Sequence, residues 1–342
     1  MDRQMSSLRI GFLGTGFIAS THAKSLAKLD SVEITALCNH HIEKAQTFNE
    51  KFCDGKATCY DDFDKMLDQE ELDVLYVCLP PGAHDGQVEK AAAKGIHLCL
   101  EKPIALTVER AQSMFDAVKQ AGVKCQIGHH MRHTAPAIKL KQMLEDGSAG
   151  KPLMFQGRFF VNCLFPKWWR DPNGGGGQLI EQSIHIYDMA RYFMGEGQSA
   201  YAQTDNLNHQ HYDDYKVDDV SAAVIRFANG SVASICASNV AEPKGGEIDF
   251  TMMCEKVYVA FETIDKATFV YHDGKPSEEI DGDVRKEVIV SEHNCYDELN
   301  RNFIAAITDG EALRSGIEDG LESLRMVLAC AQSSRTNQPQ QL

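Results

Sequence analysis

The sequence predicts an α/β protein in two parts: an N-terminal doubly wound parallel sheet, and a C-terminal α+β domain whose mostly antiparallel sheet is open on one face. Three observations support this fold class. Short apolar runs alternate with helical segments through the first half of the 342 residues, a glycine-rich turn follows the first run, and strand patterns dominate the second half. A chain of this length exceeds one ordinary core, so we expect two domains, over residues 1–130 and 131–342, with a C-terminal helix that can pack back on the first.

Apolar runs that end at turn residues are typical of buried parallel strands, and the stretches between them have helical spacing. The expected strands span residues 8–13, 34–38, 74–79, 96–100 and 124–128, and the expected helices span residues 18–29, 43–52, 88–94 and 108–120. In such a sheet ligands bind at the carboxyl ends of the strands, so the loops that follow the strands are where function is expected.

The turn after the first strand has the pattern of a phosphate-binding loop. It consists of Gly14, Thr15, Gly16, Phe17 and Ile18 and continues into the first expected helix. Side chains in place of either glycine would keep the backbone away from a pyrophosphate, and a helix start attracts its negative charge. Tight turns without a ligand can have the same letters, but the position between a strand and a helix favours a Rossmann domain that binds NAD or NADP.

The end of the second expected strand leaves the choice between NAD and NADP open. NAD sites usually carry a carboxylate there for the ribose hydroxyls, whereas this chain has Asn39 and His40. Asn39 can hydrogen-bond a ribose hydroxyl without repelling a 2′-phosphate. His40 can contact either the adenine or that phosphate.

Two later segments carry groups suited to oxidation of an alcohol, which needs a base for the hydroxyl proton and a donor for the developing oxygen charge. Lys102 follows a buried strand and precedes a proline, so its loop is stiff; the alternative is an ordinary surface turn. In the expected helix 178–194, Glu181, His185 and Asp188 share one face. The acid would orient the histidine ring and raise its basicity, and the alternative is a solvated polar stripe.

In this order the glycine turn, the segment Glu101-Lys102-Pro103 and the acid–histidine helix resemble the glucose–fructose oxidoreductase, inositol dehydrogenase and MocA (Gfo/Idh/MocA) family over nearly the whole chain. The resemblance implies an NAD(P)-dependent oxidoreductase acting on CH–OH groups of a sugar, polyol, inositol or related compound. It implies that Lys102 contacts substrate and nicotinamide, with Glu101 beside it, and that His185 is the catalytic base. Glu181 stands where dehydrogenases of the family carry aspartate, so its longer arm is expected to reach His185.

The resemblance also implies roles for residues after other strands. Pro80 and His84 match a loop near the nicotinamide ribose, and Arg132 matches an arginine where substrate and cofactor meet. Separately from the resemblance, Trp168, Trp169 and Arg170 precede a run of four glycines. Because indoles stack on sugar rings, these residues are expected to line a sugar pocket, with packing at a domain edge as the equal alternative.

Composition narrows the function classes. The net charge of −15 argues against nucleic acid and anionic membranes, which bind Lys and Arg. The N-terminal stretch 1–9 has no apolar core and no later run is long enough to span a bilayer, so we expect a cytoplasmic protein.

The eleven scattered cysteines predict reduced thiols. No metal is expected, because His129 and His133 at i, i+4 lack a third ligand at sensible spacing.

The second half predicts a sheet domain. Expected strands span residues 154–161, 220–227, 232–238, 248–253, 257–261 and 268–271, and expected helices span residues 296–307 and 320–332. Asn229-Gly230 between two of these strands is a strong type I′ hairpin signal. The face of this sheet that the helices leave uncovered predicts a homodimer or homotetramer.

The family resemblance leaves two other functions open, because some relatives are glycosidases that hold NAD and others became regulatory proteins. The first is a glycosidase that uses NAD for transient oxidation and then eliminates a leaving group, and a glycoside assay would reveal free sugar without net reduction of the cofactor. The second is a ligand sensor without turnover, against which the presence of both Lys102 and His185 counts.

Overall fold

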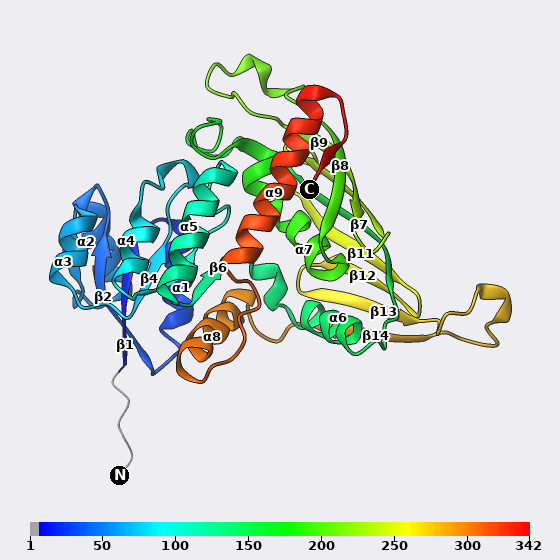
Figure 1. Cartoon of the computed structure of the whole chain (residues 1–342), viewed down its shortest axis with the longest axis horizontal. Helices are drawn as coiled ribbons and strands as arrows, with labels where there is room; N and C mark the ends of the chain where they lie inside the picture. The colour runs from blue at the N-terminus through cyan, green and yellow to red at the C-terminus, as the bar shows by residue number, and fades with distance from the viewer. Residues whose placement is uncertain (1–6) are drawn as a thin grey trace, which may run out of the picture. The chain divides into compact units, whose positions relative to one another are not determined.

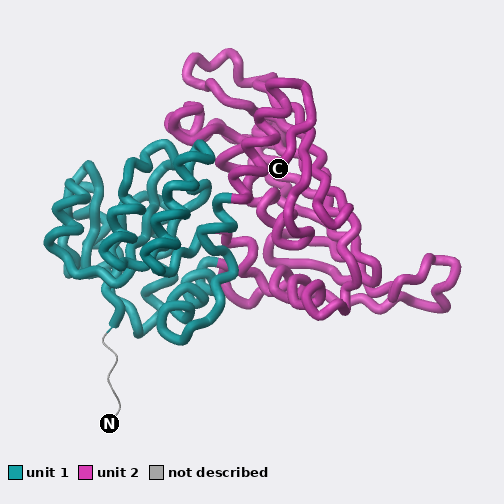
Figure 2. The backbone as a smooth tube through the Cα atoms, in the orientation of Figure 1, with its two compact units in different colours: residues 1–128, 296–321 teal, residues 129–295, 322–342 magenta. Residues whose placement is uncertain are grey.

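The computed structural model describes residues 7–342, which form two compact units (Figure 2). Unit 1 contains the chain up to Gly128 together with Tyr296–Leu321, and unit 2 contains His129–Cys295 and Glu322–Leu342. The first six residues of the N-terminal stretch without an apolar core lie outside the described residues.

Unit 1 is built on a six-stranded parallel sheet with the order β3-β2-β1-β4-β5-β6 (Figure 1), which confirms the predicted doubly wound sheet. The strands are β1 (Leu8–Leu13), β2 (Val32–Cys38), β3 (Thr58–Tyr60), β4 (Val74–Val77), β5 (His97–Leu100) and β6 (Cys125–Ile127). The strand order reverses between β1 and β4, and the carboxyl ends on either side of that point form the usual dinucleotide crevice. The edge strand β3 and the helix after it were not predicted, because three residues carry too little pattern.

The helices of unit 1 connect and cover these strands. They are α1 (Phe17–Leu26), α2 (Ile42–Phe52), α3 (Phe63–Gln69), α4 (Gln87–Ala93), α5 (Val108–Ala121) and α8 (Cys295–Thr308), with a 3₁₀ turn, η1 (Pro81–Ala83), after β4. One buried cluster joins α1, α2 and β1 to α8, and Phe12, Tyr76 and Phe303 are among its largest fully buried side chains. The late helix α8 is therefore part of the core of the first unit. The helix α9 (Ile317–Thr336) follows, and the division between the units falls inside it.

Unit 2 contains a nine-stranded sheet with the order β14-β13-β12-β11-β7-β10-β9-β8-β15. Neighbouring strands are antiparallel except for the pair β7–β10, which is parallel. The predicted mostly antiparallel sheet is thus confirmed. The strands are β7 (Pro152–Val161), β8 (Gly197–Asp205), β9 (Val220–Phe227), β10 (Val232–Ser238), β11 (Gly246–Cys254), β12 (Val257–Thr263), β13 (Lys266–Tyr271), β14 (Arg285–Val290) and β15 (Gln340–Gln341).

The two faces of this sheet differ. The helices α6 (Ala135–Glu145) and α7 (Ile184–Met194) lie against one face (Figure 1). Along β9, residues alternate between buried and exposed, and Val224 is 56% exposed, while Val288 and Val290 on β14 are each 55% exposed. These exposed valines lie on strands that are separated by five others in the sheet, so they do not form one contiguous apolar patch.

The hairpin between β9 and β10 is present, but the predicted type I′ turn is wrong. Only Gly230 has a positive φ, of 88°, whereas a type I′ turn needs a positive φ at Asn229 as well. The Asn229 side chain instead accepts from the Ser231 backbone N–H and donates to the Met194 carbonyl. These side-chain bonds hold a longer turn than the dipeptide alone indicates.

The structure also bears on the expected reduced thiols and on the expected absence of a membrane-spanning segment. No disulfide joins the cysteines of the described residues, and burial raises the pKa of Cys38 to about 12, so its reactive thiolate form is scarce. Within residues 7–342, none of the helices is both long and apolar enough to cross a bilayer.

Candidate active site

The two glycines of the turn in unit 1 differ in what a side chain at each position would meet. Gly14 has a φ of +90°, and a Cβ there would lie 2.4 Å from the carbonyl oxygen of Cys78, so the fold itself requires glycine. A Cβ at Gly16 would meet no atom within 4 Å. The second glycine therefore leaves open space at the N-terminus of α1.

The start of α1 suits an anion. No side chain caps the helix and its first turn holds no acidic residue, so its backbone N–H groups and the helix dipole remain available for a phosphate. Phe17 is 88% exposed and does not close the turn. Together with the space at Gly16, these features fit a dinucleotide pyrophosphate, held by the backbone of Gly14 to Ile18.

We expect Gly16→Val to weaken NADH binding by about tenfold or more, the effect of roughly 1.4 kcal/mol, because the new side chain occupies the space of the pyrophosphate. Gly16 has an extended backbone, with φ −85° and ψ −163°, so valine is tolerated and the melting temperature should stay unchanged. Titration of NADH by fluorescence checks the prediction. Unaltered affinity in a normally melting variant would contradict the assignment of this turn to the cofactor.

Asn39 lies at the end of β2 and is tied to the glycine turn. Its side-chain nitrogen donates to the Thr15 hydroxyl at 2.9 Å, and its oxygen accepts from the His41 backbone N–H at 3.0 Å. The neighbouring His40 is exposed. Asn39 thus has a defined orientation beside the turn, fixed through both polar atoms of its amide, whereas the side chain of His40 is open to solvent.

The loop after β4 holds Pro80 and His84. His84 is buried, and burial lowers its pKa to about 4, with the Arg110 guanidinium contributing. His84 is therefore neutral at physiological pH. An uncharged imidazole at this edge can hydrogen-bond a ribose without adding a positive charge beside a cationic nicotinamide.

Glu101 at the end of β5 belongs to a buried hydrogen-bond chain. Its Oε1 lies 2.9 Å from Nε2 of His22 on α1, and the other ring nitrogen of His22 lies 3.0 Å from Asn300 Oδ1 on α8. The hydroxyl of Tyr76 donates to the same Asn300 oxygen at 2.9 Å. Glu101 is 7% exposed and His22 is fully buried. Glu101 therefore has a structural partner for its carboxylate, which the sequence did not indicate.

This chain also fixes the backbone of the next residue. The second carboxylate oxygen of Glu101 accepts from the Lys102 backbone N–H at 3.3 Å. A Cβ at Gly128, after β6, would lie 2.6 to 2.8 Å from the carboxyl group of Glu101, so glycine at 128 makes room for it. Lys102 thus starts a loop whose first backbone N–H is held by Glu101, and its own side chain is half-buried.

In unit 2 the expected helix 178–194 has a different first turn. Residues Gln178–Gln182 form a π-helical turn, and α7 begins only at Ile184. Because a π-turn has more residues per turn than an α-helix, Glu181 and His185 are not related by the α-helical spacing that the sequence analysis assumed. His185 lies in the first turn of α7 and is 8% exposed.

Glu181 has a partner that the sequence analysis did not foresee. Its Oε2 accepts a hydrogen bond from Nε1 of Trp169 at 2.6 Å. Trp169 is 1% exposed and packs with Tyr215 and Val217. The indole therefore holds the carboxylate of Glu181, and it is Trp168, 39% exposed, that presents an accessible indole in this loop.

Arg170 and Arg132 both have carboxylate partners. Arg170 Nη1 pairs with Asp214 at 2.8 Å. Arg132 forms a bidentate pair with Asp188, with Nε and Nη2 at 2.8 and 2.7 Å, and both residues are nearly fully buried. Ser323 donates to the same carboxylate at 2.8 Å. Asp188, which lies one helical turn after His185, therefore connects α7 to the segment after β6 and to α9.

A further acid, Asp218, binds the backbone at the start of the π-turn. Asp218 Oδ2 accepts from the Leu179 backbone N–H at 3.0 Å. Burial raises the pKa of Asp218 to about 7, although that hydrogen bond opposes the shift. No spacing rule links residue 218 to this helix, so sequence reasoning had no means of finding it.

We expect the free energy of unfolding of Asp218→Asn, relative to that of the parent, to increase as the pH rises. The folded protein keeps a proton on the Asp218 carboxyl group up to about pH 7, whereas the unfolded chain loses this proton at about pH 4. The stabilisation from this proton is thus complete below the unfolded pKa and is lost as the pH rises through the folded pKa. Urea denaturation of both proteins at about pH 5 and about pH 8 measures the difference; a difference independent of pH would refute the shift.

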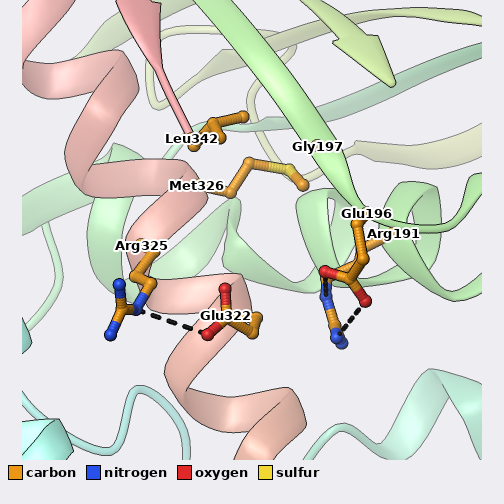
Figure 3. Close-up of a pocket in the computed structure, with 7 residues that line it drawn as sticks. All are labelled: Arg191, Glu196, Gly197, Glu322, Arg325, Met326 and Leu342. Carbon is orange, nitrogen blue, oxygen red and sulfur yellow. Dashed lines mark hydrogen bonds and ion pairs between the residues drawn. The ribbon is translucent and has the colours of Figure 1, made fainter. Parts of the chain in front are cut away.

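A pocket elsewhere in unit 2 lies among α7, β8 and α9 (Figure 3). Its charges are balanced in pairs, with Arg191 bound to Glu196 at 2.7 Å and Arg325 close to Glu322 at 3.3 Å. Met326 and Leu342 supply its apolar wall. Paired charges leave little to bind a ligand, so we assign this pocket no function. Within the described residues, no group of three or more acidic, histidine or cysteine side chains is placed to hold a metal ion.

Comparison with known proteins identifies the class. A family model described as an oxidoreductase family with an NAD-binding Rossmann fold matches residues 8–129, and the model of the same family's C-terminal alpha/beta domain matches residues 141–342. The chain therefore belongs to the Gfo/Idh/MocA oxidoreductase family, and its first unit contains the NAD-binding Rossmann domain.

The relatives agree with this membership. The myo-inositol 2-dehydrogenase of Thermotoga maritima is 26% identical over 95% of this chain and 96% of its own length. The D-glucoside 3-dehydrogenase of Escherichia coli is 31% identical, but the match spans 56% of this chain and about half, 55%, of that protein. A structure of levoglucosan dehydrogenase in complex with NADH and levoglucosan has a TM-score of 0.88 at 21% identity, covering 98% of this chain and 99% of that one, which shows the shared fold.

Proposed function

We propose that this protein is an NAD(P)-dependent dehydrogenase that oxidises a hydroxyl group of a sugar, polyol, inositol or related compound. The observation that carries the proposal is the pair of anchored reactive residues on this family's scaffold: Lys102 after β5, next to a carboxylate fixed by His22, and His185 in the first turn of α7. The names of the relatives, which are dehydrogenases of an inositol and of a glucoside, support the substrate class.

Each residue has a role that its chemistry allows. His185 accepts the hydroxyl proton on a ring nitrogen, and the Lys102 ammonium stabilises the negative charge that develops on the oxygen. Bound NAD would supply the hydride acceptor. Glu181, whose carboxylate is held by the Trp169 indole, is proposed to position the segment that leads to His185.

The remaining site residues divide into two groups. Gly14 to Ile18, Asn39, His40, Pro80 and His84 are proposed to bind the dinucleotide, with Glu101 acting through the Lys102 loop. Arg132, whose guanidinium binds Asp188, is proposed to position α7. For the sugar we propose Trp168, whose indole is exposed, together with Arg170 from the same loop.

Assays of a panel of sugars, inositols and polyols with NAD and then NADP test the proposal by the absorbance of the reduced cofactor. A substrate reduced or oxidised with 1:1 cofactor turnover supports it. Binding of NADH without turnover of any compound of this class would overturn it, and release of free sugar from a glycoside without net reduction of the cofactor would replace it by the glycosidase function.

A further inference from the structure

His185 lies in a cluster of histidines that its role as a base does not by itself explain. The ring of His130 is 4.6 Å from the ring of His185, centroid to centroid, with the planes at 68°. His129 is on the same segment, with its ring 6.4 Å from that of His185. Three imidazoles therefore meet where a single base is needed.

The three rings differ in their access to solvent. His129 is 1% exposed and His185 is 8% exposed, whereas His130 is only half-buried. A base at the site of His185 must dispose of the proton that it takes from each substrate molecule. Because the His185 ring is nearly enclosed, the more exposed ring of His130, which contacts it, offers the proton the shortest route to solvent.

The two carboxylates nearest in sequence to His185 both bind other side chains. Asp188 is bound to Arg132 and Ser323, and His129 lies 3.5 Å from the same carboxylate. The other carboxylate on this segment, Glu181, is held by Trp169. These two carboxylates are thus occupied in contacts with other side chains, while a second imidazole in contact with the first can accept a proton from it.

We propose that His130 is a second acid–base residue of the site, which takes the proton from His185 and passes it to solvent. An N–H bond of the His185 imidazolium breaks, an N–H bond forms on His130, directly or through one water, and His130 then releases the proton to water. The two rings hold one proton between them, because two cations at this separation repel. The proposal rests on the proposed function, since it takes His185 as the base.

The first experiment needs no substrate. The titration of the His185 ring is followed by NMR in the parent and in His130→Phe, which keeps the ring contact and removes the charge. We expect the midpoint of His185 to rise by about one pH unit, because a like charge is removed. His211→Asn is the control, since His211 also stacks on a ring, that of Tyr212 at 4.1 Å, but is exposed and outside the cluster. An unmoved midpoint in both His130→Phe and His130→Asn would overturn the proposal.

The second experiment uses turnover. His130→Phe should lower kcat by about tenfold, with KM unchanged, and added imidazole should restore it, because a small base replaces the lost acceptor. A residue that only packs would give no rescue, and unchanged kcat or absent rescue would overturn the relay. If the parent turns over no compound, the proposed function fails, and the NMR titration still decides whether the two rings share a proton.

Discussion

Lys102→Met should lower turnover by about 100-fold or more while NADH binding stays nearly unchanged. One donor to a developing oxyanion contributes roughly this much. Methionine fills a similar volume without the ammonium. The backbone of residue 102 remains held by Glu101, so the loop should keep its path. Steady-state kinetics on the first substrate found, with cofactor titration alongside, measure the two effects separately.

Lys119→Met is the matched control for this experiment. Lys119 lies in the last turn of α5 and its side chain is 57% exposed, so its loss should leave turnover and affinity as they are. Near-normal turnover in Lys102→Met would show that Lys102 is a turn residue. An equal loss of NADH affinity would instead assign it to cofactor binding.

Arg132→Met should destabilise unit 2 by about 3–5 kcal/mol, the cost of leaving a buried carboxylate without its partner. The pair with Asp188 is bidentate and both side chains are almost inaccessible to water. The stacking of the guanidinium on Tyr192, 4.6 Å from the ring centroid, is lost as well. Urea denaturation, followed by circular dichroism, gives the change in unfolding free energy.

The double variant Arg132→Met, Asp188→Leu separates charge from packing. Replacing both partners of a buried pair by apolar groups is often nearly neutral, so the double variant should recover most of the stability that Arg132→Met loses. A double variant no more stable than Arg132→Met would mean that packing around the guanidinium, and not the orphaned carboxylate, causes the loss.

The parallel sheet was predictable because its signals are local. Each buried strand from β1 to β6, apart from β3, is a short apolar run next to a turn, and the glycine turn falls between β1 and α1 as expected. The family resemblance depended on residues at the ends of two of these strands and on the acid–histidine helix of unit 2. The strand pattern of unit 2 followed from alternation, although β8 and β14 were missed because their polar residues weaken it.

The partners of the site residues were not predictable, because they come from distant parts of the chain. Glu101 binds His22 from α1, and His22 in turn binds Asn300 from α8, which also accepts from Tyr76 on β4. Spacing suggested that Glu181 and His185 were one α-helical turn apart, and only the backbone reveals the π-turn. Asp218 reaches Leu179 across 39 positions of sequence. The motifs indicated which residues belong to the candidate site, whereas contacts between distant segments determine the burial and the hydrogen-bond partners of these residues.

The contact between Gly128 and Glu101 has a consequence for substitution in this fold. The carboxyl group occupies the volume that a side chain at position 128 would need, so a larger residue there would displace the carboxylate from its present place. A shorter acid at position 101, as in the pair Gly128→Ala with Glu101→Asp, would relieve that overlap. Such a compensated exchange would withdraw the carboxylate from His22 by about one methylene, and the length of one side chain is thus coupled to the absence of another.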